Sequence, residues 1–252
     1  MSAATLIAPT PLAVLPGAIS DEIIAMIDRV RPSVVQVRRG RHGSGAGVIW
    51  QTDGGIITNN HVVAGHGGTI EVLLTDGRTL EAQVTARNRT LDLAMLKVAA
   101  DDLPAAPVAD STRLRVGDLV FAVGHPWGQR GVVTAGIVSG LGHVRAPGSR
   151  ETAPYIRSDV LLAPGNSGGP LLDATGAVAG INAMIFGGDL GVAIPSHVTT
   201  AWVAELPGRP MYLGVELRPV QLQTSPRRGP WPGRAHGSQV VAITPGSPAA
   251  TA

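Results

Sequence analysis

The sequence predicts an all-β protein with two small antiparallel barrels, and three observations support this fold class. Short runs rich in Val, Ile and Leu alternate with turn residues between residues 33 and 196, a pattern typical of many short strands. Glycine and proline are frequent, at 33 and 20 of the 252 residues, as a chain with many turns requires. A polar, proline-containing stretch at residues 99–111 separates two strand-rich halves, and we interpret it as the connection that crosses the seam between the two barrels.

The first barrel is expected over residues 33–108. Asp53-Gly54 and Asp76-Gly77 each lie between two apolar runs and are typical of tight hairpin turns. The expected strands are residues 33–37, 47–50, 55–58, 70–74, 81–84 and 93–98. The second barrel is expected over residues 114–200, and a short helix over residues 196–205 closes it. Its main strands are expected at residues 119–123, 131–139, 155–158, 171–172, 177–181 and 191–194.

The N-terminal segment, residues 1–30, is expected to consist of an arm and a short helix. Residues 1–19 are expected to be disordered or loosely docked. Ser20 is the predicted N-cap of a helix that ends at Pro32, because a proline disfavours helical geometry in the residue before it. The apolar face of this helix is expected to contain Ile23, Ile24, Ile27 and Val30.

The composition excludes several classes of function. The chain has no cysteine, which excludes disulfides and thiolate metal sites, and its histidines show no metal-ligand spacing; no metal or cofactor is expected. The net charge is only +2 and no long basic run occurs, so no nucleic-acid partner is expected. The first 20 residues are interrupted by prolines and have no Lys or Arg before their apolar part. We therefore expect neither a signal peptide nor a membrane span there, which by sequence favours the cytoplasm.

The most informative stretch is Gly165-Asn166-Ser167-Gly168-Gly169-Pro170. Small residues surround the serine, so this loop can present the serine hydroxyl outward. The backbone N–H groups of Gly165 and Ser167 can then point at one site, as an oxyanion hole requires, with the N–H of Asn166 as a third donor. The alternative is a glycine-rich surface turn, and catalysis requires a base and a group that orients the base.

Candidates for both partners lie upstream. A β-branched run delivers His61 to the end of the strand expected at residues 55–58, where it can act as a general base. Asp92 is a lone carboxylate between apolar residues, and burial of such a group is costly unless a donor binds it. A histidine N–H is such a donor, so Asp92 is the candidate for orienting His61.

The order histidine, aspartate, serine, with gaps of 31 and 75 residues, resembles that of chymotrypsin-like proteases and in particular their bacterial HtrA (Deg) branch. Five stretches resemble HtrA sequences in the same order. They are residues 43–49 (GSGAGVI), 58–63 (TNNHVV), 91–98 (LDLAMLKV), 165–171 (GNSGGPL) and 191–196 (GVAIPS). The resemblance implies two six-stranded chymotrypsin-like barrels in a protease domain over residues 31–205, with the active site in the cleft between them.

The resemblance also implies the roles of single residues. His61, Asp92 and Ser167 form the catalytic triad, and Gly165, Asn166 and Ser167 form the oxyanion hole. His125 stands where relatives usually carry asparagine, and we interpret it as a structural loop residue.

Substrate preference can also be predicted from the resemblance. The residue at the base of the S1 pocket lies six positions before the serine in this fold, which is Leu161 here. Leu162, Ile185 and Phe186 are expected to add apolar walls. No carboxylate is placed to bind Arg or Lys, so we expect cleavage after small or medium aliphatic residues such as Val, Ala or Ile.

Residues 211–252 resemble the first part of a PDZ domain. Residues 212–217 are similar to its carboxylate-binding loop and first strand, and residues 240–250 to its next strand and the start of its helix. About 40 residues are too few for a complete domain, so a truncated PDZ domain is expected. The alternative interpretation is a tail rich in proline and glycine.

The leading hypothesis is an ATP-independent serine endopeptidase that cleaves unfolded or misfolded proteins through an acyl-enzyme. ATP is not expected because no phosphate-binding glycine loop ending in lysine occurs. A peptide-binding holdase or scaffold with an inactive or conditionally ordered site is one alternative, and an esterase on the same fold is another. The resemblance implies a homotrimer and the cell envelope or periplasm, in contrast to the cytoplasmic location that the sequence favours.

Overall fold

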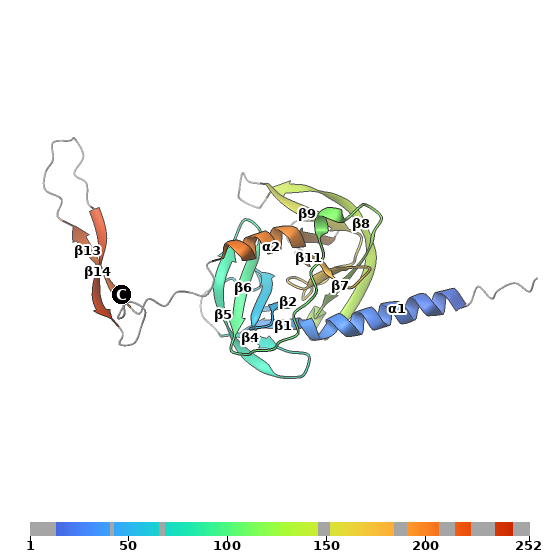
Figure 1. Ribbon diagram of the computed structural model, residues 1–252, viewed down its shortest axis with the longest axis horizontal. Helices are drawn as coiled ribbons and strands as arrows, with labels where there is room; N and C mark the ends of the chain where they lie inside the picture. The colour runs from blue at the N-terminus through green and yellow to red at the C-terminus, as the bar shows by residue number, and fades with distance from the viewer. Residues whose placement is uncertain are drawn as a thin grey trace, which may run out of the picture. The chain divides into compact units, whose positions relative to one another are not determined.

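The computed structural model describes residues 14–40, 43–65, 69–145, 152–183, 191–206, 215–222 and 235–243. The chain divides into two compact units, Met1–Leu206 and Pro207–Ala252. The larger unit contains two closed antiparallel barrels of six strands each (Figure 1). This confirms the predicted fold class.

The first barrel closes in the strand order β1-β2-β3-β6-β5-β4. Its strands are β1 (Val34–Arg39), β2 (Gly43–Gln51), β3 (Gly55–Asn59), β4 (Ile70–Leu73), β5 (Thr79–Asn88) and β6 (Leu93–Val98). Asp53-Gly54 connects β2 to β3, and Asp76-Gly77 connects β4 to β5, as predicted. Gly54 and Gly77 have φ angles of +96° and +92°, a conformation that explains why glycine occupies the second position of each turn.

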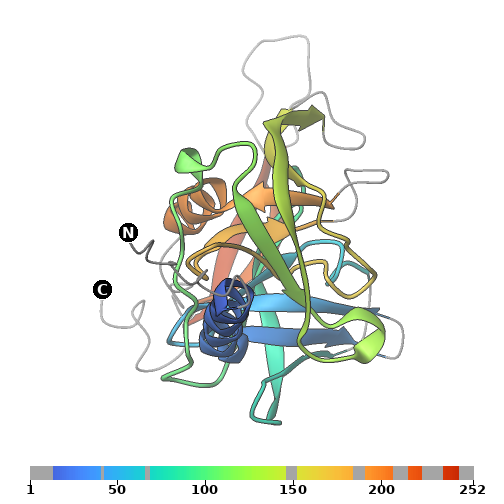
Figure 2. The ribbon, with the colours of Figure 1, turned by 90° about the vertical axis from the view of Figure 1, so that its right-hand side faces the viewer.

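The second barrel closes in the order β10-β11-β12-β9-β8-β7. Its strands are β7 (Leu119–Gly124), β8 (Val132–Arg145), β9 (Thr152–Ser158), β10 (Pro170–Asp173), β11 (Val178–Asn182) and β12 (Gly191–Pro195). Short 3-10 turns, η1 (Arg31–Ser33), η2 (Ser111–Arg113) and η3 (Pro126–Gly128), lie between elements. Figure 2 shows the blue and teal strands of the first barrel beside the green to orange strands of the second.

Small aliphatic side chains fill both barrels, as expected from a chain in which only 3% of residues are aromatic. The buried centre of the first barrel includes Val35, Val37, Ile49, Ile56 and Leu96. That of the second includes Val120, Ala122, Val138, Ile156 and Leu171. A third cluster joins the barrels through Val34, Val48, Ile57, Phe121, Val123 and Leu172. Because burial of one such side chain stabilises the fold by about 1.5–3 kcal/mol, this third cluster fixes the two barrels against each other at the seam.

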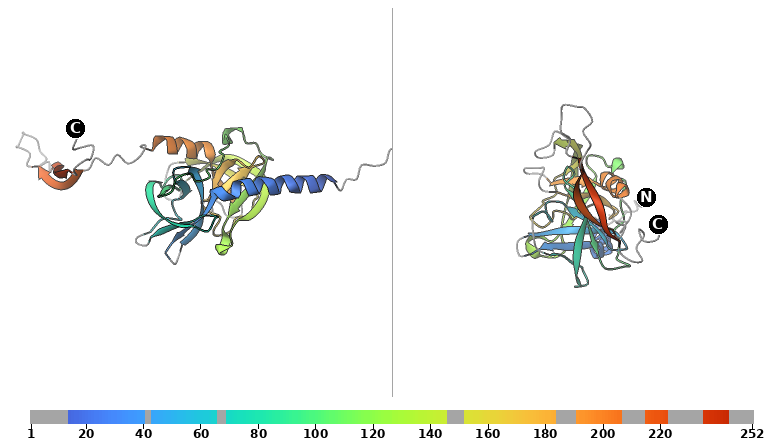
Figure 3. Two further views of the ribbon diagram at one scale, coloured as in Figure 1. Left: turned by 60° about the horizontal axis from the view of Figure 1, so that its bottom comes forward. Right: turned by 90° about the vertical axis from the view of Figure 1, so that its left-hand side faces the viewer.

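Helix α1 (Val14–Val30) runs along the outside of the barrels (Figure 3, left). It begins at Val14, so the prediction of an arm is wrong for residues 14–19, and Ser20 lies inside the helix instead of capping it. Pro16 is compatible with this earlier start because the N–H groups of a first helical turn have no intrahelical partner to lose.

The buried face of α1 differs from the predicted one by a single position. Met26, Ile27 and Val30 are buried in the cluster that joins the barrels, and Ile23 packs against it. Ile24 is 58% exposed, so its assignment to the apolar face is wrong. The hydrophobic residue that replaces it in the core is Met26, which also lies against the β10–β11 turn at Gly176.

Helix α2 (Ser196–Glu205) follows β12 and occupies the predicted range. Its Trp202 is buried in the cluster that joins the barrels. Ser196 donates its hydroxyl proton to the carbonyl of Ala109 at 2.6 Å, which ties the start of α2 to the connection between the barrels. None of the helices in the described ranges is both long and apolar enough to cross a membrane.

In the smaller unit the structure describes one antiparallel pair of strands, β13 (Val215–Leu222) and β14 (Ala235–Ile243). Their register runs from Val215 opposite Ile243 to Leu222 opposite Ala235. Two paired strands do not distinguish a partial PDZ domain from other β structure. The assignment of residues 211–252 to a partial PDZ domain stays a prediction.

Candidate active site

Strand pairing in the first barrel brings His61 and Asp92 together. β3 and β6 pair antiparallel with Asn59 opposite Leu93, so the residues just beyond these strand ends meet at one edge of the barrel. The first contact beyond the strands is the N–H of Asn60, which donates to the carbonyl of Asp92 at 3.0 Å. His61 follows directly, which places its side chain next to that of Asp92.

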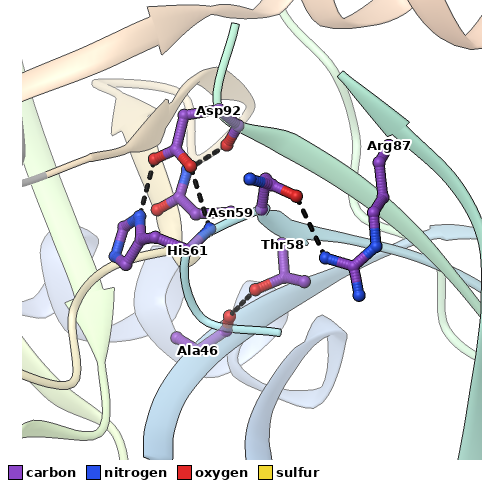
Figure 4. A network of polar contacts seen from close by, with 7 residues as sticks. Ala46, Thr58, Asn59, His61, Arg87 and Asp92 are labelled. Carbon is purple, nitrogen blue, oxygen red and sulfur yellow. Dashed lines mark hydrogen bonds and ion pairs between the residues drawn. The ribbon is translucent and has the colours of Figure 1, made fainter. Parts of the chain in front are cut away.

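Both carboxylate oxygens of Asp92 are used by His61 (Figure 4). The ring Nδ1 lies 2.6 Å from Oδ2, and the backbone N–H of His61 donates to Oδ1 at 2.9 Å. The Asp92 residue is only 5% exposed, so its carboxylate oxygens rely on these two donors in place of water. The contact selects the tautomer with a proton on Nδ1, because an ionised carboxylate only accepts hydrogen bonds. The other nitrogen, Nε2, is then free to accept a proton.

Asp92 has a φ of +55°, which is uncommon for a residue with a side chain. Its carbonyl accepts two hydrogen bonds at 3.0 Å, from the Asn60 N–H and from the side-chain amide of Asn59. These contacts hold the backbone turn that aims the carboxylate at His61. Sequence analysis did not identify Asn59 and Asn60 as supporting residues.

The loop that carries Ser167 belongs to the second barrel but lies against the first. The carbonyl of Ser167 accepts the N–H of Ala46 on β2 at 2.8 Å. Gly168, with a φ of +84°, comes so close to the carbonyl of Ala46 and the hydroxyl of Thr58 that a Cβ atom there would collide with both. Thr58 in turn donates to the Ala46 carbonyl at 2.7 Å. Glycine at position 168 is thus required by the close approach as well as by the backbone angle.

The same loop also borders the segment that carries His61. A Cβ atom added to Gly45 would lie 2.7 and 2.8 Å from the two methyl groups of Val62 and 3.0 Å from the carbonyl of Ser167. Gly45 therefore touches both the neighbour of His61 and the backbone of Ser167. The structure thus brings Ser167 and the His61 segment side by side at the seam between the barrels.

Backbone donors are present beside the serine. Within the described residues, the N–H groups of Gly165 and Ser167 have no hydrogen-bond acceptor. The φ of Gly165 is +110°, which is open to glycine and strained for other residues. The N–H of Asn166 donates to the carbonyl of Ala163 at 2.9 Å, which argues against its expected role as a third oxyanion donor.

Of the residues predicted to bind substrate, the structure describes two. Leu161 is 76% exposed, which does not match a residue buried at the base of a pocket. Leu162 packs against the core of the second barrel, and its Cδ1 atom would lie 3.3 Å from a Cβ at Gly191. Ile185 and Phe186 lie outside the described residues.

A buried histidine supports the loop that precedes Ser167. His125 is 6% exposed, and its backbone N–H donates to the carbonyl of Gly165 at 3.1 Å. Trp127 adds a second contact, from its N–H to the carbonyl of Pro164 at 3.2 Å. The segment from His125 to Trp127 therefore holds the backbone on which the Gly165 donor is presented. Nothing in the sequence around His125 predicts this contact.

The environment of His125 disfavours its charged form. Its Nδ1 accepts the N–H of Gly131 at 3.2 Å, whereas Nε2 has no hydrogen-bond partner of normal geometry in the described part of the chain. Burial, with smaller contributions from the charges of Arg130 and Arg38, lowers the pKa of His125 from 6.5 to about 4; the nearby carbonyl of Val35 acts in the opposite direction. His125 is therefore neutral at pH 7.

The lowered pKa of His125 predicts a dependence of stability on pH. In the unfolded chain His125 binds a proton below about pH 6.5, whereas the folded protein resists protonation until about pH 4. His125 therefore lowers the free energy of unfolding as the pH falls through this window, by roughly 2–3 kcal/mol between pH 7.5 and 4.5. Urea unfolding of the wild type and of His125→Asn at both pH values measures the effect. Between the two pH values, we expect the free energy of unfolding to fall by roughly 2–3 kcal/mol less in the variant than in the wild type. An equal fall in both proteins would contradict the prediction.

A buried aspartate hydrogen-bonded to a histidine, beside a serine loop with two backbone N–H groups that have no acceptor among the described residues, is the arrangement of the two-barrel serine peptidases. Residues 45–181 match the trypsin-like peptidase domain family. A solved structure described as an HtrA-type protease AlgW with tripeptide is 34% identical, with a TM-score of 0.66, over 77% of this chain and 68% of that one. The chain belongs to the trypsin-like peptidase family, in its HtrA-type branch.

Longer curated relatives agree with this assignment. A probable periplasmic serine endoprotease DegP-like of Marinomonas sp. (strain MWYL1) is 40% identical over 218 residues, which cover 83% of this chain and 45% of the relative. A putative serine protease HhoB of Synechocystis sp. (strain ATCC 27184 / PCC 6803 / Kazusa) is 37% identical over 230 residues, which cover 83% of this chain and 54% of the relative. The chain thus spans about half the length of these curated relatives.

Proposed function

We propose that this protein is a serine endopeptidase that hydrolyses peptide bonds through an acyl-enzyme. The observation that carries the proposal is the His61–Asp92 pair, with both carboxylate oxygens engaged, beside a serine loop anchored across the seam. Ser167 is the nucleophile, His61 the general base and then acid, and Asp92 the group that orients His61.

The proposed steps are those of a serine peptidase with a histidine base. The Ser167 hydroxyl oxygen attacks the substrate carbonyl while Nε2 of His61 takes the hydroxyl proton. The N–H groups of Gly165 and Ser167 stabilise the negative charge that develops on the carbonyl oxygen. His61 then returns its proton to the leaving amine, which leaves an acyl group on Ser167. A water molecule, deprotonated by the same Nε2, hydrolyses that ester and restores the serine.

The proposed substrates are unfolded or misfolded protein chains, cleaved after small or medium aliphatic residues without ATP. The partly buried, apolar Leu162 supports an uncharged S1 pocket, to which Ile185 and Phe186 would add walls. Relatives named as periplasmic endoproteases support a location in the cell envelope. We assign residues 31–205 to the protease domain and residues 211–252 to a partial PDZ domain.

Digestion of an unfolded protein tests this proposal. We expect the purified chain to cut reduced casein without ATP, and mass spectrometry of the products to show new C-termini at Val, Ala and Ile. The Ser167→Ala variant serves as the control for contaminating proteases. New C-termini at Arg or Lys would contradict the S1 assignment. Casein that stays intact with a folded wild type would contradict the peptidase assignment and favour a binding role.

A further inference from the structure

The segment that follows His61 is held by two arginines from other strands. Its backbone forms only a short turn, in which the N–H groups of Val63 and Ala64 donate to the carbonyls of Asn60 and His61 at 3.2 and 3.4 Å. The carbonyl of Val63 accepts two guanidinium N–H groups instead. One comes from Nη1 of Arg39 at the end of β1, at 2.7 Å, and one from Nη2 of Arg87 on β5, at 2.9 Å.

Each guanidinium also donates a hydrogen bond to a residue at one end of the same segment, Arg87 at its start and Arg39 at its end. Nη1 of Arg87 donates to the side-chain oxygen of Asn60 at 3.0 Å. Nη2 of Arg39 donates to the carbonyl of Gly65. The anchor points lie on both sides of His61 in the chain. A guanidinium is planar and its N–H groups have fixed directions, so such a pair of contacts restricts orientation as well as position.

Asn60 connects these arginines to the catalytic carboxylate. While its side-chain oxygen accepts from Arg87, its backbone N–H donates to the carbonyl of Asp92 at 3.0 Å. Asp92 has the positive φ noted above, and that turn depends on its carbonyl contacts. A continuous chain of hydrogen bonds thus runs from Arg87 through Asn60 to the residue that orients His61.

This arrangement places the positive charge of Arg87 close to those of Arg39 and Arg89. Burial and the charges of Arg39 and Arg89 lower the pKa of Arg87. Among the described residues, no carboxylate forms an ion pair with Arg87. The repulsion costs free energy that the hydrogen bonds to Asn60 and Val63 must offset. Arg87 is therefore bound to the His61 segment itself, and not to an acidic neighbour.

We propose that Arg87, assisted by Arg39, is a positioning residue that holds the His61 segment so that the imidazole lies between Asp92 and Ser167. The inference rests on the proposed peptidase function. Arg87 touches none of the reacting atoms and acts through Asn60 and Val63. Since a misplaced base slows the chemical step without weakening substrate binding, loss of Arg87 lowers kcat and leaves KM nearly unchanged.

Arg87→Met tests the proposal, because methionine keeps much of the side-chain length and removes the guanidinium. We expect kcat for a peptide substrate to fall about 10-fold or more, with KM within about twofold of the wild type. Arg89→Met is the matched control, since it removes the same charge two residues away and, among the described residues, Arg89 forms no ion pair and no hydrogen bond with the His61 segment. The control is expected to keep the wild-type kcat. Equal kcat values in the two variants would overturn the proposal.

Two further readouts separate positioning from a general loss of structure. In Arg87→Ala, added ethylguanidinium is expected to restore part of kcat, whereas ethylammonium is not, because only the guanidinium can bind Asn60 and Val63 together. In a Ser167→Ala background, the proton NMR signal of the His61 Nδ1–H is expected to shift or broaden on Arg87→Met and to persist unchanged on Arg89→Met. An unchanged signal in both would overturn the proposal. This NMR measurement needs no turnover, so it stays decisive even if the wild type hydrolyses no peptide and the proposed function fails.

Discussion

Replacement of Ser167 by alanine is expected to lower kcat for peptide hydrolysis by roughly 10⁶-fold, because it removes the hydroxyl that is proposed to form the acyl-enzyme. The substitution removes one oxygen atom and leaves the backbone contacts of the loop in place. The bond from the Ala46 N–H to the residue 167 carbonyl uses no side-chain atom, so the anchoring across the seam should persist. Single-turnover hydrolysis of a chromogenic peptide measures the effect.

The control for this variant is its stability. We expect the urea midpoint of Ser167→Ala to equal that of the wild type, and its binding of unfolded casein to be retained. Activity within about tenfold of the wild type would contradict the assignment of Ser167 as the nucleophile. In that case a different group performs the chemistry, and the serine loop has another role.

Asp92→Asn is expected to lower kcat by roughly 10⁴-fold while the fold is kept. The reason lies in how both oxygens of Asp92 are used. The backbone N–H of His61 requires an acceptor at the Oδ1 position, so the new amide places its oxygen there and its NH₂ group against Nδ1. Nδ1 must then accept, the ring proton moves to Nε2, and Nε2 can no longer take the proton of Ser167.

Asp76→Asn provides the matched control for Asp92→Asn. Asp76 lies in the exposed β4–β5 turn, where it pairs with Arg78. Its replacement by asparagine is expected to leave kcat unchanged. The pH dependence of kcat/KM and the NMR signal of Nδ1–H, recorded for both variants, report the tautomer of His61 directly. Equal rates for Asp92→Asn and Asp76→Asn would show that Asp92 does not orient the catalytic base.

Much of the fold was predictable because each strand is marked by its own local pattern. The glycine turns at Asp53-Gly54 and Asp76-Gly77 mark two hairpins. The register of β3 against β6 brings the backbones of the His61 and Asp92 segments together, and the positive φ of Asp92 then aims its carboxylate at His61. The start of α1 was mispredicted because Ser20 resembles a cap, whereas a proline is equally acceptable in the first turn of an earlier helix.

The contacts that support the site could not be predicted in the same way. Arg87 and Asn60 are 27 residues apart, and no periodicity in the sequence indicates that their side chains meet. The burial of His125 depends on the packing of its loop against Gly165, which joins two distant segments. The exposure of Leu161 likewise follows from the path of a loop and not from the identity of the residue.

Labelling with a fluorophosphonate probe tests the central claim most directly, because the probe reacts only with a serine that a neighbouring base has activated. We expect the wild type to form one covalent adduct, located at Ser167 by peptide mass spectrometry. The labelling rate should fall sharply in His61→Ala and in Asp92→Asn and stay at the wild-type value in Asp76→Asn. An adduct at another residue, or a folded wild type that the probe does not label, would contradict the assignment of His61, Asp92 and Ser167 as one catalytic unit.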